Sequence, residues 1–465
     1  MTVKRLSGLD FVQPPRVNAE KLQSIIDGLG EAGGELVFAR GRYKFSTVFL
    51  RSNLTFTFEE GAEVYGSGHF DDFESDEEVD YPLYQDASHS FFNCSLFVGK
   101  DLENVTFRGN GKIDMQSVWD GAYKRKISSR GAKPLAFKNC KNLKFDGFTI
   151  VNATDLALYF AGCEKVEVAN LKLRVHIDGI SPDNSKNVYI HDCDVESGDD
   201  AIVLKSSYTL NRLDYCKDVR IERCKLKSRC NAFKLGTETN GGFYNITLQD
   251  CEIYETRMAG IALESVDGAI LDGIAVKNIK MTNVSTPFFV HLGKRLRGPQ
   301  GTKIGAIRNI TFENITATGP YVPYKIVEQN YTNYLLNNDV HDPKVFGGGA
   351  GYQANEPTEE WQIASTVCGL QNYPLENISF ENVSLTLEGG VREYNREVPE
   401  EAQSYPEVYV YGRILPAKGV YFRHIKGLTI KNFNVETYRA DKRETFVFDD
   451  VTGLEYKKFA KGEQR

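Results

Sequence analysis

The chain has 465 residues, a formal net charge of −7 and a sequence isoelectric point near 5.7. An acidic chain argues against partners that require a net basic surface, so we expect it to bind neither nucleic acid nor membrane. The length fits two or three ordinary domains, or one elongated repeat protein without a single large core.

The N-terminal segment MTVKRLSGLDFVQPPRVNAEKL lacks the apolar stretch of a signal peptide, and no run of about 18 apolar residues occurs anywhere. The nine cysteines are scattered without a CxxC pair, which favours free thiols in a reducing compartment. We therefore expect a cytoplasmic protein. A secreted or periplasmic protein whose leader has been removed would show the same features.

The first predicted element is a helix that caps the N-terminal end of the fold. Asn18 is a suitable N-cap for AEKLQSIIDGLGEAGG, in which Leu22, Ile25, Ile26 and Leu29 share one face and glycines follow. Solenoid proteins need such a cap to cover their first coil. The sequence predicts this cap within residues 15–40.

A five-residue phrase then recurs along the chain and indicates short strands. Polar and apolar residues alternate in each copy, which is typical of a strand with one buried face. Copies include SNLTF ending at Phe56, ENVTF at Phe107, KNLKF at Phe145, EKVEV at Val168, KNVYI at Ile190, RNITF at Phe312 and ENISF at Phe380. Through the middle of the chain they are spaced by roughly 22 to 36 residues, a period typical of solenoids.

No helical period interrupts this series, so the crossover helices of a doubly wound sheet are not expected. The prediction is an all-β protein, a parallel β-helix, in which Val188 and Ile190 point inward. The Asn that precedes many of the strands suits left-handed backbone geometry and can stack as a ladder. This ladder also accounts for the Asn-x-Ser/Thr sequences at Asn245, Asn309 and Asn377, so we do not expect glycosylation there.

We expect residues 1–465 to form a single β-helix domain. Three long stretches, near residues 65–92, 115–135 and 319–373, break the rhythm of the strands. Loops of this length are often functional. The aromatic residues in these stretches favour walls of a binding cleft, closed at one end and therefore suited to exo action.

Three carboxylates form the leading candidate site. Asp178 lies in the segment HIDGISPDNS, and Asp199 and Asp200 lie about one coil later in SGDDAIVLKS. Matching positions on successive coils are about 4.8 Å apart, so the three side chains are expected to be neighbours on the outer surface. Any one Asp could simply close a turn, but three together favour a site.

Clustered carboxylates on a β-helix fit three chemistries. They can bind calcium for β-elimination, hydrolyse a glycosidic bond by acid and base catalysis, or bind a sugar without reaction. Inverting hydrolysis needs one protonated and one ionised carboxyl group with room for a water molecule. Crowding favours this split, because ionisation of one carboxyl group raises the pKa of its neighbour.

The order of motifs resembles glycoside hydrolase family 28, the polygalacturonases and related pectin hydrolases. It is carried by GGELVFARGRY, RSNLTFTFEEGAEVYGS, GNGKIDMQSVW, HIDGISPDNS, SGDDAIVLKS and LGTETNGGF, and it spans residues 15 to about 320. The resemblance implies a right-handed parallel β-helix and inverting hydrolysis without a cofactor or metal.

By this resemblance, Asp178 occupies the position of the Asp in the family's NTDG motif, although His176 and Ile177 precede it here. Asp199 and Asp200 match the family's Asp pair. The resemblance implies that Asp199 is the general acid that protonates the leaving oxygen. Asp178 and Asp200 are then expected to position and deprotonate the attacking water.

At two places the sequence departs from the family pattern. Alignment on LGTETNGG puts Cys230 at the family's histidine, and the segment GIALES puts Ala262 and Glu264 at its Arg-x-Lys motif. A galacturonate carboxylate beside Glu264 would be repelled by about 1 kcal/mol or more. We therefore expect an activity other than plain polygalacturonase, with a neutral sugar beside the scissile bond and Glu264 accepting hydroxyl hydrogen bonds.

Further residues are candidates for substrate binding. Lys234, on the strand face of Cys230, is expected either to enter the cleft or to be a solvated outer-strand lysine. Glu238, Arg257 and the HLGKR cluster, with His291, Lys294 and Arg295, follow on later coils. One of these can hold a substrate acid or replace the missing histidine, although each alone is most often a surface or turn residue. Cys230 is either reactive or buried and inert.

The sequence thus predicts a glycoside hydrolase that cleaves plant-derived, pectic oligosaccharides, with an oligosaccharide as its partner and no cofactor. Two alternatives stay open. A β-eliminating lyase would need calcium and a base such as Lys234 or Lys205, and a non-catalytic glycan-binding β-helix would bind sugar without producing new reducing ends. The sequence does not predict an oligomeric state.

Overall fold

The computed structural model describes residues 2–84, 87–118, 130–319, 363–400, 405–412 and 414–457. These residues divide into two compact units. Unit 1 contains residues up to 203 and residues 207–219, and unit 2 contains residues 204–206 and those from 220 onward. The predicted stretch 319–373 lies mostly outside the described residues, and the prediction of one continuous domain stays a prediction.

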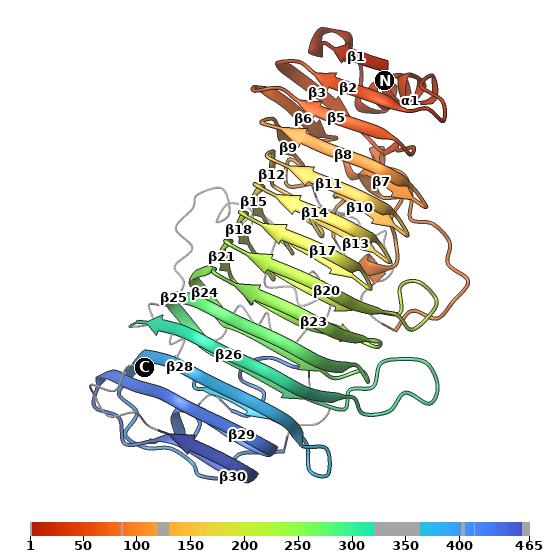
Figure 1. Cartoon of the computed structure of the whole chain (residues 1–465). Helices are drawn as coiled ribbons and strands as arrows, with labels where there is room; N and C mark the ends of the chain where they lie inside the picture. Colours follow the sequence, from red (N-terminus) through yellow and green to blue (C-terminus); the bar gives the residue numbers. More distant parts are fainter. Residues whose placement is uncertain are drawn as a thin grey trace. The chain divides into compact units, whose positions relative to one another are not determined.

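Unit 1 is built from short parallel strands that return to the same place in every coil (Figure 1). Each coil contributes one strand to each of three sheet faces, and each strand pairs with its equivalent in the next coil. The first face contains β4 (Val48–Phe49), β7 (Ser95–Lys100), β10 (Lys133–Lys138), β13 (Leu158–Ala161) and β16 (Ile180–Asp183).

The other two faces of unit 1 follow the same rule. The second contains β1 (Thr2–Leu6), β2 (Gly34–Phe38), β5 (Leu54–Phe58), β8 (Glu103–Gly109), β11 (Lys141–Asp146), β14 (Glu164–Ala169) and β17 (Lys186–His191). The third contains β3 (Gly41–Phe45), β6 (Ala62–Gly66), β9 (Lys112–Asp114), β12 (Thr149–Val151), β15 (Lys172–Val175) and β18 (Asp194–Ser197). This pattern confirms the predicted parallel β-helix.

Unit 2 also consists of parallel strands, several of them long enough to run from one face into the next. They are β21 (Lys225–Ser228), β22 (Phe233–Thr239), β23 (Gly242–Gln249), β24 (Glu252–Ser265), β25 (Ile270–Leu292), β26 (Ala306–Thr318), β27 (Ser365–Cys368), β28 (Leu375–Gly389), β29 (Ala417–Arg439) and β30 (Glu444–Lys457). The strands β19 (Ile202–Ser206) and β20 (Tyr215–Glu222) contain the points where the chain passes from one unit to the other.

The interior of unit 1 is a stack of inward-facing apolar side chains. Phe56, Phe107 and Phe145 occupy equivalent positions in successive coils. The first two rings stack with centroids 4.6 Å apart and the next pair with centroids 5.9 Å apart. Val188 and Ile190 are buried as predicted. Period-2 alternation in the sequence is thus a direct record of which side chains fill the interior.

Asparagines at the turns form the predicted ladder. Asn53, Asn104 and Asn142 have φ values of 63°, 59° and 57°, a left-handed geometry that Asn tolerates better than most residues. The amide of Asn104 donates to Asn53 at 2.8 Å, and the amide of Asn142 donates to Asn104 at 2.6 Å. The ladder therefore ties the turns of adjacent coils together.

The N-terminal helix is present, but its predicted start was wrong. Helix α1 spans Pro15–Asp27, because Pro15 has the fixed φ that suits the first helical position. Asn18 is buried inside the helix, where its amide donates to the backbone carbonyls of Phe11, Gln13 and Lys44. It therefore anchors the entering chain instead of capping the helix.

Among the residues that the structure describes, three short 3-10 helices occur, at Gly8–Asp10, Phe70–Asp72 and Ala87–His89. No helix in the described ranges combines the length and apolar character needed to cross a bilayer.

Candidate functional site

The three predicted carboxylates lie in equivalent turns of two adjacent coils of unit 1. Asp178 follows β15 and precedes β16, and Asp199 and Asp200 follow β18 and precede β19. The strands before the turns pair in register. After the turns, the N–H of Gly179 donates to the carbonyl of Asp200 at 3.0 Å. Coil stacking therefore superimposes the two turns.

The side chains of these turns converge as predicted, but Asp178 and Asp200 are buried, so the expected position on the outer surface was wrong for these two. One carboxylate oxygen from each of Asp178, Asp199 and Asp200 lies within 4.8 Å of the others. Asp178 and Asp200 are only 3% and 4% exposed, whereas Asp199 is half-buried. The backbone N–H of Asp200 donates to Asp178 Oδ1 at 3.3 Å, which links the two more buried residues. Asp199 is thus the carboxylate of the three that is most open to solvent.

Such an arrangement supports two kinds of chemistry. Three carboxyl groups this close together can present a proton donor and a proton acceptor to one substrate. The same oxygens are the ligand type that Ca²⁺ and Mg²⁺ prefer. Within the described part of the chain, this trio is the group of three acidic, His or Cys side chains close enough to share a metal ion.

A charged cluster in the preceding coil was not predicted from the sequence. Asp155 lies in the corresponding turn, between β12 and β13, and is fully buried. Its carboxylate is 3.2 Å from the ammonium of the equally buried Lys133 and 3.8 Å from the guanidinium of Arg130, and it accepts a hydrogen bond from Ser88. The spacing of 155 to 178, one coil, was the signal that could have identified Asp155.

His176 lies two residues before Asp178 and is buried close to it in the chain. Its Nε2 lies 2.8 Å from the hydroxyl of Ser117, and the residue is 8% exposed. Burial lowers the pKa of His176 to about 4, because the imidazolium form would lose its hydration. At neutral pH this side chain therefore adds no positive charge beside Asp178.

The predicted substrate-binding residues lie in unit 2, where two of them form a buried ion pair. The ammonium of Lys234, on β22, is 3.5 Å from Oε1 of Glu264, on β24, and the side chains are only 4% and 1% exposed. The interpretation of Lys234 as a solvated lysine was therefore wrong. The charge of Glu264 is balanced by this ammonium.

Glu238 and His291 are also buried, so neither is the surface or turn residue that each alone would suggest. Glu238 pairs with the ammonium of Lys205 at 3.2 Å. His291 Nδ1 lies 2.6 Å from the hydroxyl of Tyr411, and its ring stacks on Phe289. These contacts fix both side chains within unit 2.

The remaining candidates differ in burial. Cys230 is buried, Arg257 is half-buried and Lys294 is exposed. All nine cysteines are buried and without disulfide bonds, as predicted. Lys294 is therefore the surface residue of this set.

The neighbour of Lys294 forms a second buried ion pair that sequence reasoning did not resolve. Arg295 Nε lies 3.0 Å from Asp267 Oδ1, and the guanidinium stacks over the ring of Tyr405. Burial alone would lower the pKa of Arg295, but the hydrogen bonds to Asp267 and its charge raise it above the usual value. Tyr405 lies more than a hundred residues away along the chain, so no local pattern could have indicated this contact.

The burial of His176 predicts a specific pH dependence of stability. The pKa is about 6.5 when the chain is unfolded and about 4 when it is folded. As pH falls from 6.5 to 4, the imidazole of His176 binds a proton in the unfolded state but stays neutral in the folded state. The free energy of unfolding therefore falls by up to about 3 kcal/mol. Above pH 6.5 this contribution is present in full.

His176→Asn should therefore flatten the fall in urea-unfolding free energy between pH 6.5 and 4. The exposed His69 provides the control, because His69→Asn should keep the wild-type slope. Equal slopes for wild type and His176→Asn would contradict the assignment.

Comparison with known proteins places this geometry in a family. The family described as "Glycosyl hydrolases family 28" matches residues 46–329, more than half of the chain. An exopolygalacturonase of Arabidopsis thaliana is 28% identical over 238 residues, which cover 48% of this chain and 54% of that protein. An endo-polygalacturonase of Pectobacterium carotovorum subsp. carotovorum is 23% identical over 226 residues, covering 46% and 54%. The chain spans about half the length of the curated relatives it matches.

Solved structures share the fold. The family 28 exopolygalacturonase of Yersinia enterocolitica gives a TM-score of 0.69 at 14% identity, covering 97% of this chain and 78% of that one. The exopolygalacturonase of Thermotoga maritima gives 0.63 at 15% identity, covering 82% and 87%. These likenesses confirm the predicted right-handed parallel β-helix. Because the family match covers most of the chain and includes all three aspartates, the protein belongs to the glycosyl hydrolases of family 28.

Proposed function

We propose that the chain hydrolyses glycosidic bonds in pectic oligosaccharides, with inversion at the anomeric carbon. The observation that carries this proposal is the convergence of Asp178, Asp199 and Asp200 within 4.8 Å at a turn that is partly open to solvent. The polygalacturonases among its relatives support pectin as the source of the substrate.

The differing exposure of the three carboxylates suggests their roles. Asp199, the most open, protonates the glycosidic oxygen as the bond to the leaving sugar breaks. Asp178 and Asp200, linked by the hydrogen bond from the Asp200 N–H, hold a water molecule between them. One of this pair removes a proton from the water as its oxygen attacks the anomeric carbon.

The spacing of the trio bears on the stereochemistry. Inverting enzymes with two carboxyl groups usually separate them by about 6.5–9.5 Å, and retaining enzymes by about 5–5.5 Å. Here the nearest oxygens of three carboxylates lie within 4.8 Å. With three groups, the water is held by the linked pair and need not fit between the acid and a single base, so inversion does not require the wider spacing.

The ion pairs of unit 2 support a preference for an uncharged sugar. Lys234 and Glu264 neutralise each other, as do Arg295 and Asp267. A buried pair of this kind offers hydrogen bonds without net charge, so a neutral sugar loses less hydration on binding beside it than a carboxylate does. We propose that Glu264, together with Lys234, contacts a neutral sugar of the substrate, with exo action on the chain end.

A β-eliminating lyase is the second candidate, because the trio can also supply oxygen ligands to Ca²⁺. A chelator separates the two reactions. With EDTA, release of reducing ends should stay at the wild-type rate and the products should lack the ultraviolet absorbance of an unsaturated ring. Loss of activity together with such absorbance in untreated samples would establish the lyase, and sugar binding without any products would establish a binding protein.

Asp199→Asn tests the assignment of the general acid. The amide cannot donate the proton, so kcat on pectic oligosaccharides should fall by about 10²–10⁴-fold while the unfolding transition stays unchanged. Asp192→Asn is the matched control, since Asp192 lies in an outer turn of the same coil with a φ of 55° that Asn accepts. Near-normal turnover of Asp199→Asn would refute the assignment.

Glu264→Gln tests the neutral-sugar proposal. The change leaves the Lys234 ammonium without its carboxylate, so the surroundings of residue 264 become positively charged. The ratio of kcat/KM for a uronate-ended substrate to that for a neutral-ended one should rise by roughly tenfold, about 1.4 kcal/mol. Glu252→Gln, at an exposed position of the same strand, should leave the ratio unchanged. A ratio that stays constant or falls in Glu264→Gln would contradict this role.

A further inference from the structure

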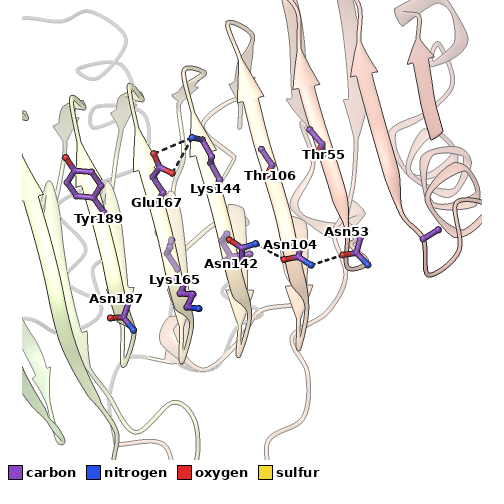
Figure 2. Close-up of a pocket in the computed structure, with 13 residues that line it drawn as sticks. Asn53, Thr55, Asn104, Thr106, Asn142, Lys144, Lys165, Glu167, Asn187 and Tyr189 are labelled. Atoms are coloured by element: carbon purple, nitrogen blue, oxygen red, sulfur yellow. Dashed lines mark hydrogen bonds and ion pairs between the residues drawn. The ribbon is translucent and has the colours of Figure 1, made fainter. Parts of the chain in front are cut away.

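Unit 1 carries a hollow on a sheet face that holds none of the three aspartates. It is a groove of about 700 Å³, lined by residues of β5, β8, β11, β14 and β17 and by Ala32 and Asn53, which precede β5 (Figure 2). The catalytic turns instead join β15 to β16 and β18 to β19. The groove is therefore separate from the proposed active site.

The floor of the groove is a straight row of side chains, one from each coil. Strand register places Thr55, Thr106, Lys144, Glu167 and Tyr189 at equivalent positions. At about 4.8 Å per strand, the row extends over roughly 19 Å. A linear polymer with polar groups at a short, regular interval matches such a row better than a globular partner does.

The asparagine ladder along the edge of this row is interrupted in the middle of the groove. Strand register puts Lys165 between Asn142 and Asn187, where an Asn would continue the ladder. Lys165 has a φ of 58°, the left-handed geometry that its asparagine neighbours also adopt but that lysine rarely does. Placing lysine here therefore costs both backbone strain and the ladder hydrogen bonds.

The charge of Lys165 is not used within the described structure. No described residue forms an ion pair or hydrogen bond with its exposed side chain, and Figure 2 shows it beside Asn187 without the contacts that join Asn53, Asn104 and Asn142. By contrast, the ammonium of Lys144 lies 3.3 Å from Glu167 Oε2. Strained residues cluster at functional sites. A strained lysine without a contact inside the described structure therefore suggests contact with a ligand.

An aromatic ring lies one strand beyond Lys165. The half-buried Tyr189 stacks on His191, with ring centroids 4.2 Å apart, which holds the ring in place. A fixed aromatic ring with an adjacent cation suits a sugar that has an apolar ring face and a carboxylate.

We propose that this groove is a non-catalytic binding site for an acidic oligosaccharide, in which Lys165 pairs with a uronate carboxylate and Tyr189 packs against a sugar ring. The choice of a pectic uronate chain rests on the proposed function. The site would hold the polymer on the enzyme independently of cleavage.

The test uses the full chain with Asp199→Asn, so that the probe, hexagalacturonate, is not consumed during calorimetry. The parent should bind this all-uronate probe at the groove. Lys165→Asn should weaken that binding roughly fivefold, since an exposed ion pair contributes at most about 1 kcal/mol. Tyr189→Ala should weaken it too, and Lys172→Asn, an exposed lysine on another face, should leave it unchanged.

Lys165→Asn has a second expected effect that a merely structural lysine would not produce. Because Asn fits the left-handed geometry and restores the ladder, the thermal midpoint should rise while binding falls. Unchanged binding in both Lys165→Asn and Tyr189→Ala, or equal groove affinity for a carboxyl-reduced hexasaccharide, would overturn the proposal.

Release of reducing ends by wild type and binding by the variants test the two proposals separately. If wild type releases reducing ends but the Lys165 and Tyr189 variants bind like the parent, the groove assignment is wrong and the hydrolase assignment stands. If wild type releases none but Lys165→Asn and Tyr189→Ala weaken binding of the probe, the groove assignment stands alone.

Discussion

Register between successive coils is the constraint on which the candidate site depends. Asp178 and Asp200 are 22 positions apart in the sequence, and they meet only because the strands before and after their turns pair without a slip. A shift of one residue would turn every side chain of a strand to its opposite face. Inward-facing rings and the asparagine ladder oppose such a shift, so features far from the carboxylates hold them together.

Much of this arrangement was predictable because it follows from local sequence patterns, namely the alternation of polar and apolar residues and the spacing of the turns. Alternation in KNVYI placed Val188 and Ile190 inside, and the recurrent Asn placed the turns. The distance between Asp178 and the Asp199-Asp200 pair equals one coil, so stacking alone predicted their convergence. The same argument applied to Asp155 would have found the cluster with Lys133, because it too lies one coil from Asp178.

Other features depend on partners that no local pattern specifies. The start of α1 was set by Pro15, whose fixed φ favours the first helical position over the side-chain cap offered by Asn18. Lys234 lies on β22 and Glu264 on the paired strand β24. The pairing of β24 with β25 shifts register between Thr256 and Ala259, so the position of Glu264 could not be obtained by counting residues. The partners of Arg295 and His291, Tyr405 and Tyr411, come from a segment more than a hundred residues later.

Both units contain buried ion pairs. Buried cations described here have carboxylate partners, as in Lys133 with Asp155 and Arg295 with Asp267, because an uncompensated charge away from water would cost several kcal/mol. Lys165 on the exposed groove carries no such partner among the described residues. The cations of these buried pairs are thus neutralised inside the protein, whereas the charge of Lys165 lies where a ligand can reach it.

If the three aspartates act together in hydrolysis with inversion, the configuration of the first product will reveal it. Proton NMR can follow the anomeric signal during the first minutes of cleavage, before mutarotation. We expect the new reducing end to appear first with the anomeric configuration opposite to that of the bond cleaved. A product that first appears with the same configuration, or with an unsaturated ring, would contradict it.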